Sequence, residues 1–364
     1  MSASPSTAWP VSATDARADP TAARTAVDRA LEAFLSSKQP SGRPERSGPG
    51  TDHLIAVLRA FLSGCGKRVR PLFCHIGWRA ATSTPPDVRI TNVGVGLELL
   101  HGHALVHDDV VDRSLLRRGN PAVHVAYADL HGGDAWHGLS AAVLLGDMAA
   151  LWAEEHFARL YEPGVPPAAR DHLGAMRAEL LNGQLLDLVK PSQLFGTVPE
   201  AFAVIHAKTV AYTVLGPLLI GAAMAGADPD VTDALAGYAR PLREAFQLQD
   251  DLEDVTAGPN CPGGGEDLKE GKRTVVVALA AEAATTGQRA SMTRLLGRAG
   301  MDKLRSTIAA TGAVEQVRAM ITARRGKALE RAANGPFTET GRALLSAMTD
   351  VALPGVADWP EVAA

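Results

Sequence analysis

The hydrophobic and polar positions of this 364-residue chain repeat with α-helical spacing over most of its length. Such stretches run roughly through residues 69–82, 86–113, 139–161, 167–190, 197–226, 229–255, 272–286 and 313–333. Asp19 and Pro20 can cap and start a helix that ends near Phe34, and Thr51 can cap residues 52–63. Neither a convincing period-two pattern nor strand–helix alternation is found. The pattern predicts an all-α fold.

The helical pattern continues without a domain-scale linker. We therefore expect a single helical domain over residues 23–355, although the length alone suggests two domains. Residues 1–22 are predicted to be a disordered tail, residues 37–50 a loop and residues 356–364 a C-terminal tail. Residues 259–265 are predicted to form a flexible loop, which could close over a site or simply connect surface elements.

Composition narrows the class of protein. A net charge of −4 and a pI near 6.3 give no support for nucleic-acid binding. The aromatic share of 5%, with abundant Ala and Leu, favours helix over sheet. Cys65, Cys74 and Cys261 form neither a metal-ligand spacing nor an even disulfide framework, so a reducing, cytoplasmic setting is expected.

Two segments resemble targeting or membrane signals only superficially. The first 24 residues have no apolar core, so no secretory signal is predicted there. Residues 209–227 approach the length of a membrane span, but they contain Pro217 and many weakly apolar Gly and Ala residues. A buried helix broken at Gly216 and Pro217 is the better interpretation, and no membrane span is predicted.

Two Asp-Asp-x-x-Asp clusters lie in otherwise apolar helical stretches. They are residues 108–112 and 250–254. On a helix, Asp108 and Asp112 project together while Asp109 turns aside, and Asp250 and Asp254 do the same. One such cluster could equally be a solvated acidic helix end. Two of them, each flanked by basic residues, predict a cage of oxygen ligands suited to Mg²⁺ and substrate phosphates.

Basic residues recur close to these clusters. They occur in residues 66–71 (Gly-Lys-Arg-Val-Arg-Pro), 117–119, 208–209 and 269–274. The first of these segments follows a glycine break and precedes a helix, where backbone N–H groups and Lys or Arg side chains bind anions. Any one segment could be solvated surface charge. Together with the carboxylates, they predict a site for two polyanions, one held through metal and one by Lys and Arg alone.

The order of these segments resembles the trans-isoprenyl diphosphate synthases, the polyprenyl synthetase family, and in particular its actinobacterial geranylgeranyl diphosphate synthases. The resemblance covers about residues 25–350. It rests on residues 66–71, 101–112, 117–121, 144–147, 183–188, 208–213, 246–254 and 267–274. It implies an antiparallel helix bundle around a deep central cavity, usually dimeric. It also implies head-to-tail condensation of isopentenyl diphosphate with an allylic diphosphate, such as dimethylallyl, geranyl or farnesyl diphosphate.

The resemblance also implies roles for individual residues. Three Mg²⁺ ions would hold the allylic diphosphate, with Asp108, Asp112 and Asp250 as direct ligands. Supporting or water-mediated positions would belong to Asp109, Asp187, Asp251 and Asp254. Arg117, Lys208 and Lys272 would contact the same diphosphate, and Lys67, Arg70, His101 and Arg118 would hold isopentenyl diphosphate. Gln184 is a further substrate-binding candidate, and Thr209 and Gln247 would lie near the reacting carbons and the leaving oxygen.

Product length depends on the floor of the pocket. His103 stands five residues before Asp108, where the family often has Phe or Tyr, and Ala104 beside it is small. We predict that His103, completed by Met148, forms part of the floor and that a twenty-carbon product follows. A farnesyl or longer-chain product is the alternative. His103 could instead be a hydrogen-bonded core histidine with no role in length.

Two other functions fit parts of the pattern. A class I terpene cyclase shares the implied fold and one acidic cluster, but it usually replaces the second cluster and has no use for Lys67, Arg70 and Arg118. A non-catalytic subunit of a two-protein synthase tends to lose acidic ligands, and none is missing from either cluster. The condensation reaction is therefore preferred.

Overall fold

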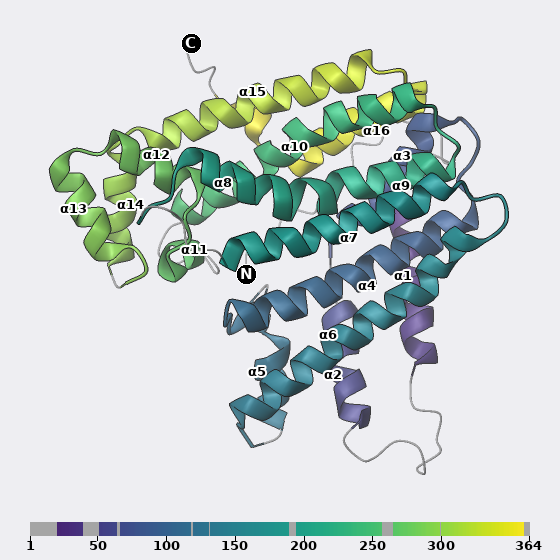
Figure 1. Ribbon diagram of the computed structural model, residues 1–364, viewed down its shortest axis with the longest axis horizontal. Coiled ribbons are helices and arrows are strands. Elements are labelled where there is room, and N and C mark those ends of the chain that lie inside the picture. The colour runs from purple at the N-terminus through teal and green to yellow at the C-terminus, as the bar shows by residue number, and fades with distance from the viewer. Residues whose placement is uncertain are drawn as a thin grey trace.

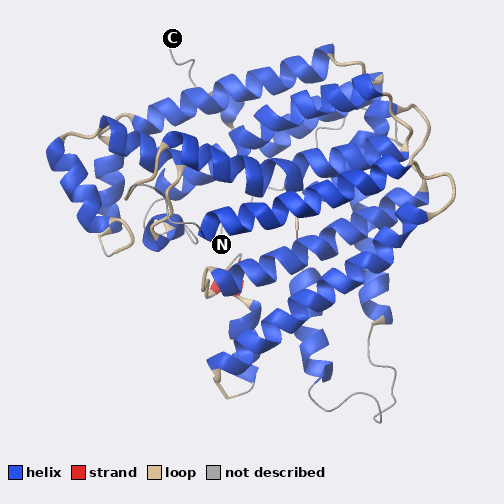
Figure 2. Cartoon of the chain, in the orientation of Figure 1, coloured by secondary structure: helices blue, strands red, loops and turns tan. Residues whose placement is uncertain are grey.

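The structure is a computed structural model that describes residues 20–38, 51–63, 66–117, 119–130, 132–188, 194–256, 265–298 and 300–359. Long helices lie side by side across the molecule, with α15 at one edge and α6 towards the other (Figure 1). Helices make up nearly all of the described chain (Figure 2). Within the described ranges, the only sheet is the short antiparallel pair of β1 (Leu116–Arg117) and β2 (Asn120–Pro121). The all-α prediction is confirmed.

The helices have the following bounds. In the first half they are α1 (Pro20–Ser37), α2 (Thr51–Ser63), α3 (Val69–Ala81), α4 (Val88–Val111), α5 (Val123–Leu130), α6 (Ala135–Phe157), the 3₁₀ turn η1 (Ala158–Tyr161) and α7 (Pro167–Leu188). In the second half they are α8 (Val198–Ile205), η2 (His206–Leu215), α9 (Gly216–Met224), α10 (Pro229–Thr256), α11 (Glu266–Glu270), α12 (Val275–Ala283), α13 (Thr286–Leu295), α14 (Met301–Ala309), α15 (Ala313–Asn334), α16 (Glu339–Ala352) and the 3₁₀ turn η3 (Val356–Asp358).

The long periodic stretches of the sequence correspond to α3, α4, α6, α7, α10 and α15. The pattern missed the shorter helices α5, α13, α14 and α16. Two of these carry a start signal that could have revealed them. Thr285 and Gln288 form a capping box before α13, and the Thr338 side chain accepts a hydrogen bond from Gly341 at the start of α16.

Helical structure extends slightly beyond both predicted bounds of the domain. Residues 20–22 belong to α1, in which Pro20 is buried, rather than to a tail. Val356 is buried in η3 and packs with the core, so the domain continues beyond residue 355. Most of the predicted tail and loop segments lie outside the described residues, including residues 1–19, 39–50 and 257–264.

The predicted break at Gly216 and Pro217 is a change of helix type. η2 is a π-helix, and Gly216 continues it directly into α9, where Pro217 stands in the first turn. Two glycines then let α9 cross α3 at backbone distance. A Cβ on Gly77 would lie 2.0 Å from the Leu218 carbonyl oxygen, and one on Gly221 would lie 1.8 Å from that of Cys74. Among the described residues, no helix is both long and apolar enough to span a membrane.

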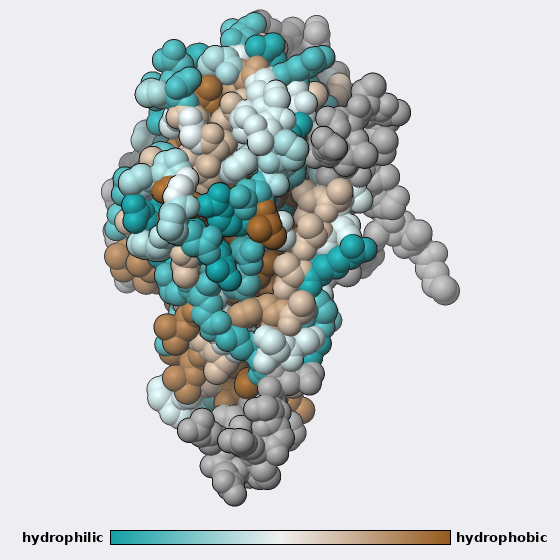
Figure 3. Space-filling view, turned by 90° about the vertical axis from the view of Figure 1, so that its right-hand side faces the viewer, coloured by the Kyte–Doolittle hydropathy of each residue, from teal (hydrophilic) through white to brown (hydrophobic). Residues whose placement is uncertain are grey.

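Exposed large apolar side chains gather on two neighbouring helices. On α6 these are Trp136, Val143, Leu144 and Leu151, and on α7 they are Leu181, Leu185, Leu186 and Leu188. Apolar surface gathers at the left-hand and lower parts of the view in Figure 3, among hydrophilic residues. An apolar surface of this kind on a folded chain is typical of an interaction face.

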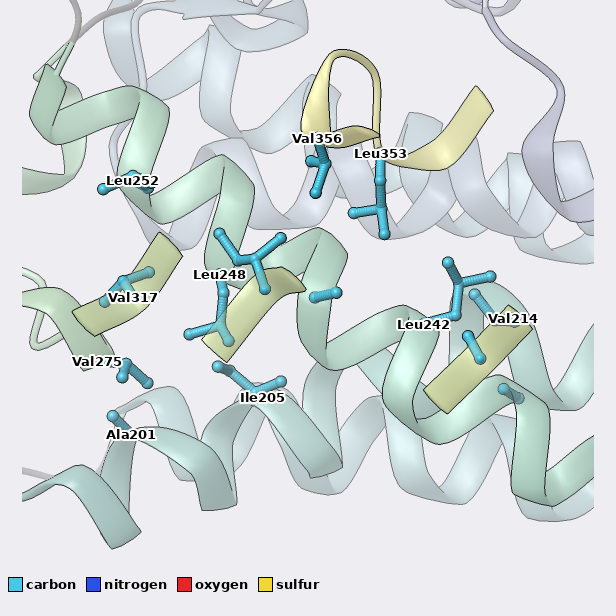
Figure 4. Packing of buried hydrophobic residues seen from close by; sticks show 14 of the residues in the cluster. Ala201, Ile205, Val214, Leu242, Leu248, Leu252, Val275, Val317, Leu353 and Val356 are labelled. Carbon is cyan, nitrogen blue, oxygen red and sulfur yellow. The ribbon is translucent and has the colours of Figure 1, made fainter. Parts of the chain in front are cut away.

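The buried side chains form two clusters. One is built around α10 and α15, and in it Leu242, Leu248 and Leu252 of α10 share a cluster with Ile205, Val214 and Val317 (Figure 4). The other is built around α1, α4, α6, α7 and α9. α4 therefore belongs to one core and α10 to the other, and each helix is held rigidly by its own cluster.

Candidate active site

A cavity of about 1220 Å³ opens between the two halves of the bundle. Its walls come from the segment before α3 and from α3, α4, α7, α8, η2, α10 and the region of α11 and α12. Twelve of the residues predicted from sequence line it: Lys67, Arg70, His101, Ala104, Asp108, Asp112, Arg117, Gln184, Gln247, Asp250, Asp251 and Lys272. Segments far apart along the chain therefore meet at one place.

α4 supplies the first acidic face. His101, Ala104, Asp108 and Asp112 all line the cavity, as expected for positions separated by three, four and seven residues on a helix. The Gln184 side chain of α7 donates a hydrogen bond of 2.8 Å from Nε2 to Oδ1 of Asp108. This bond orients the Asp108 carboxylate towards the cavity.

Asp109 is turned away from the cavity, as predicted. It is fully buried, and Arg117 donates to its Oδ1 from Nε at 2.7 Å and also from Nη2. Burial raises the pKa of Asp109, while the Arg117 guanidinium opposes that rise. Asp109 therefore positions Arg117, which itself lines the cavity and reaches within 3.5 Å of Asp108.

α10 supplies the second acidic face. Loss of contact with water raises the pKa of Asp250 to about 6, against the attraction of Arg243, even though the carboxylate is open to the cavity. The same effect of burial raises the pKa of Asp251 to about 8, although Gln247 donates a hydrogen bond to it at 2.8 Å. Asp254 points elsewhere: its Oδ1 accepts a hydrogen bond of 2.7 Å from the Gly265 N–H before α11.

These carboxylates fit a divalent cation. The raised pKa values of Asp250 and Asp251 mean that their charged forms are poorly solvated. A bound cation would offset the free-energy cost of keeping these carboxylates charged. The cavity-facing acidic groups from α4 and α10 are all oxygen donors, the type that Mg²⁺ prefers. Asp254 Oδ2 is also buried without a hydrogen-bond partner among the described residues. The carboxylate oxygens that face the cavity therefore suit Mg²⁺ as ligands.

Lys272 lies between the first acidic face and two carboxylates of α11. Its Nζ lies 3.6 Å from Asp112 Oδ2 on α4, 3.0 Å from Asp267 Oδ1 and 3.0 Å from Glu270 Oε2. Burial alone would lower the pKa of Lys272, but these three carboxylates outweigh that effect and raise it. The ammonium group therefore stays charged beside the acidic faces.

A separate basic group lies where the chain enters α3. Arg70 donates a hydrogen bond of 3.0 Å to Thr213 Oγ1 and stacks over the ring of Tyr212, with 4.3 Å from its central carbon to the ring centroid. Arg68 has a left-handed backbone, with φ of 51°. Its side chain bonds Asp28 at 2.7 Å and Glu98 at 2.9 Å. These bonds hold the segment so that Lys67 and Arg70 both line the cavity.

Arg243 is a cavity residue that sequence reasoning missed. Its side chain is 6% exposed and lines the cavity, and burial lowers its pKa to about 9 against the attraction of Asp250. It donates a hydrogen bond of 3.2 Å to Gln247 Oε1, and Gln247 in turn donates to Asp251. One signal was available: Arg243 precedes Asp250 by seven residues, just as His101 precedes Asp108.

The three residues predicted to form the pocket floor do not all face the cavity. Ala104 lines the cavity, but His103 and Met148 do not. Ala104 is four residues before Asp108, about 40° around the helix, whereas His103 is five residues before it, about 140° around. The His103 ring therefore faces α6, where Nδ1 lies 3.1 Å from the Gly146 carbonyl oxygen. This contact agrees with the alternative given for His103 from the sequence, a hydrogen-bonded core histidine with no role in product length.

Four predicted site residues cannot be placed. Arg118 lies outside the described residues, and the side chains of Asp187, Lys208 and Thr209 are not described. The backbone of Lys208 and Thr209 belongs to the π-helix η2. Such segments are rare and often occur at functional sites. The roles of these four residues stay predictions.

The fold and the cavity define a class: a helix-bundle enzyme with two facing carboxylate helices and a separate basic group. The family model for polyprenyl synthetase matches residues 51–311. The chain therefore belongs to the polyprenyl synthetase family, and it is a trans-prenyltransferase that forms short-chain prenyl diphosphates.

Curated relatives share about a third of their residues with this chain. A geranylgeranyl diphosphate synthase of Methanosarcina mazei is 33% identical over 255 residues, covering 69% of this chain and 71% of the relative. A geranylfarnesyl diphosphate synthase of Natronomonas pharaonis is 32% identical over 262 residues, covering 66% and 71%. Because these relatives differ in their named products, they leave product length open.

A solved structure matches nearly the whole chain. The geranylgeranyl pyrophosphate synthase of Corynebacterium glutamicum, complexed with isoprenyl diphosphate and magnesium, superposes with a TM-score of 0.80 at 32% identity. The match covers 94% of this chain and 99% of that one. The arrangement of helices around the cavity is therefore that of the family.

Proposed function

We propose that this protein catalyses the Mg²⁺-dependent, head-to-tail condensation of isopentenyl diphosphate with an allylic diphosphate, with geranylgeranyl diphosphate as the main product. One observation carries the proposal: carboxylates of α4 and α10 line the same cavity as a separate basic group that includes Lys67 and Arg70. The likeness to the magnesium-bound Corynebacterium enzyme supports the choice of metal.

Asp108, Asp112 and Asp250 would hold the metal, with Asp251 behind them on α10. Mg²⁺, of which we propose three per site, supplies positive charge that stabilises the diphosphate as it leaves. Arg117, oriented by Asp109, and Lys272 lie beside these carboxylates and would bind the same diphosphate. Their charges favour a group that becomes more negative as the bond to the allylic carbon breaks.

Lys67, Arg70 and His101 would hold the diphosphate of isopentenyl diphosphate without metal. This binding places the double bond next to the allylic carbocation that forms when diphosphate departs. The new carbon–carbon bond joins the two chains, and the final proton passes to the released diphosphate. Exclusion of water from the cavity once both substrates fill it would protect the cation from capture. No side chain of this protein has to act as the base.

We also propose that two copies of the chain associate through the exposed apolar residues of α6 and α7. The side chains of Leu144, Leu151, Leu181 and Leu185 are each more than 60% exposed. Apolar surface of this extent is stabilised when a second copy covers it. Sedimentation equilibrium of the purified chain would test the association, and a monomer at micromolar concentration would contradict it.

The reaction is tested with the purified chain alone. Incubation with isopentenyl diphosphate and each allylic primer in Mg²⁺ should give linear prenyl diphosphates, chiefly of twenty carbons. A cyclised hydrocarbon would indicate a terpene cyclase instead. No product from any primer would indicate a subunit that needs a partner.

Ala104→Phe should shorten the product by at least one five-carbon unit. Ala104 is the floor candidate that does line the cavity, and a phenyl ring there would fill space needed by the growing tail. His103→Ala, one residue away and facing α6, serves as the matched control. Product sizing by chromatography would contradict the assignment if Ala104→Phe gave the same lengths as the unmodified enzyme, or if His103→Ala shortened the product equally.

Arg243→Met should raise the KM for isopentenyl diphosphate by about tenfold, since a hydrogen bond to a charged group contributes roughly 1.5–3 kcal/mol. Arg243 is a buried cation that bonds Gln247 and is close enough to Arg70 for their charges to interact. It therefore belongs beside the basic group proposed to bind isopentenyl diphosphate. Arg243→Lys keeps the charge and should recover most of the affinity. If Arg243→Met left both substrate KM values unchanged and lowered only thermal stability, Arg243 would be a structural residue.

A further inference from the structure

A second group of metal-binding side chains lies outside the active-site cavity. It consists of His103 and His107 on α4 and Asp147 on α6, and one ligand atom of each lies within 4.8 Å of the others. The two imidazole rings are 4.4 Å apart between centroids. Asp147 Oδ1 lies 3.7 Å from His107 Nε2. None of the three residues lines the cavity that contains Asp108 and Asp250.

The backbone of α6 orients both rings. Nδ1 of His103 lies 3.1 Å from the Gly146 carbonyl oxygen. A carbonyl only accepts, so Nδ1 carries the proton and Nε2 keeps a free lone pair. Histidines that bind metals are usually held in this way through their other nitrogen. Nε2 of His107 lies 3.1 Å from the Val143 carbonyl oxygen and donates to it. To bind a metal ion near Asp147 through Nε2, the ring would turn and its proton would move to Nδ1.

Gly146 makes room for the site. A Cβ at this position would lie 2.3 Å from both Nε2 and Cδ2 of His107, which is too close for any side chain. The His107 ring therefore lies directly against the backbone of α6, next to Asp147. This contact keeps ligands from two helices at metal-binding separation.

Asp147 is a charged residue on an otherwise apolar face of α6. It shares the exposed face of α6 with Val143, Leu144 and Leu151, all of which are apolar. Its own side chain is 58% exposed. If a second copy of the chain covered this face, the carboxylate would lose water, and a bound cation would offset that cost. A cation held by Asp147 and the two histidines would then keep this carboxylate paired inside the interface.

We propose that His103, His107 and Asp147 bind one transition-metal dication of the Zn²⁺ type, which joins α4 to α6 separately from the Mg²⁺ site. Two imidazoles and one carboxylate suit Zn²⁺, with water as the fourth ligand, whereas Mg²⁺ prefers oxygen donors. Zn–N bonds of about 2.0–2.1 Å require the ligand atoms to move closer by rotation of exposed or half-exposed side chains.

The test is a Zn²⁺ titration of the full chain in excess Mg²⁺, in competition with a chromogenic zinc chelator. We expect the unmodified protein to bind one Zn²⁺ at this site. Asp147→Asn and His103→Ala should each weaken that binding by about tenfold or more. His172→Ala, which removes a half-buried histidine of α7 outside the group, should bind as the unmodified protein does. Asp250→Asn should also retain this site, because it alters only the acidic faces.

A second readout separates binding from misfolding. Zn²⁺ should raise the melting temperature of the unmodified protein but not that of His103→Ala, while both fold in its absence. The proposal is overturned if the unmodified protein binds no Zn²⁺ in excess Mg²⁺. It is also overturned if Asp147→Asn and His103→Ala bind Zn²⁺ as tightly as the His172→Ala control, or if Asp250→Asn abolishes the binding.

Discussion

Asp108→Ala and Asp250→Ala should each lower kcat by at least ~10²-fold in saturating Mg²⁺, comparable to the loss of a major electrostatic stabiliser. Asp108 faces the cavity from α4 and is oriented by Gln184, and Asp250 faces it from α10. Each carboxylate would hold a cation whose attraction for the diphosphate increases as that group leaves. Removing either one takes away stabilisation that is greatest in the transition state.

The measurement is steady-state turnover with both substrates saturating, repeated over a range of Mg²⁺ concentrations. Asp171→Ala, which removes an exposed carboxylate of α7, is the matched control and should leave kcat unchanged. Near-normal turnover of either Asp108→Ala or Asp250→Ala in Mg²⁺ would refute the metal assignment for that residue. Equal loss in the control would point to a general effect on folding.

Arg70→Ala should raise the KM for isopentenyl diphosphate by about tenfold or more, with a much smaller change for the allylic substrate. Arg70 lines the cavity at the start of α3 and is held by Thr213 and the ring of Tyr212. Arg70 belongs to the basic group that would bind the diphosphate of isopentenyl diphosphate without metal. The loss of one charge-assisted hydrogen bond therefore falls on one substrate only.

The two KM values are measured separately, each with the other substrate saturating. Arg240→Ala, an exposed arginine of α10, provides a control for the loss of positive charge. A rise in the allylic KM in place of the isopentenyl KM would show that the basic residues were divided wrongly between the two diphosphates.

Local spacing was enough to predict much of the site. Asp108 and Asp112 are one turn apart, so any helix through residues 108–112 presents both on one face. The same holds for His101 and Asp108, which are two turns apart. These relations depend only on helical geometry, and for this reason the cavity contains most of the residues named from the sequence.

Other features required the packed structure. Helical spacing does not say which neighbour each face meets, so His103 was assigned to the pocket although its ring faces α6 and Gly146. Arg243 looked like an ordinary polar residue of α10 until the fold buried it beside Gln247. The short helices α5, α13 and α14 contain few turns from which a period can be recognised.

The amino-acid sequence alone was enough to predict an all-α fold, two acidic helix faces and the basic segments that accompany them. Each of these is a property of a few neighbouring residues. Packing of the helices brings α4 and α10 to one cavity, Lys272 to 3.6 Å from Asp112, and His107 to 3.7 Å from Asp147. These relations join residues far apart along the chain, and they arise only when packing of two hydrophobic cores sets the positions of the helices.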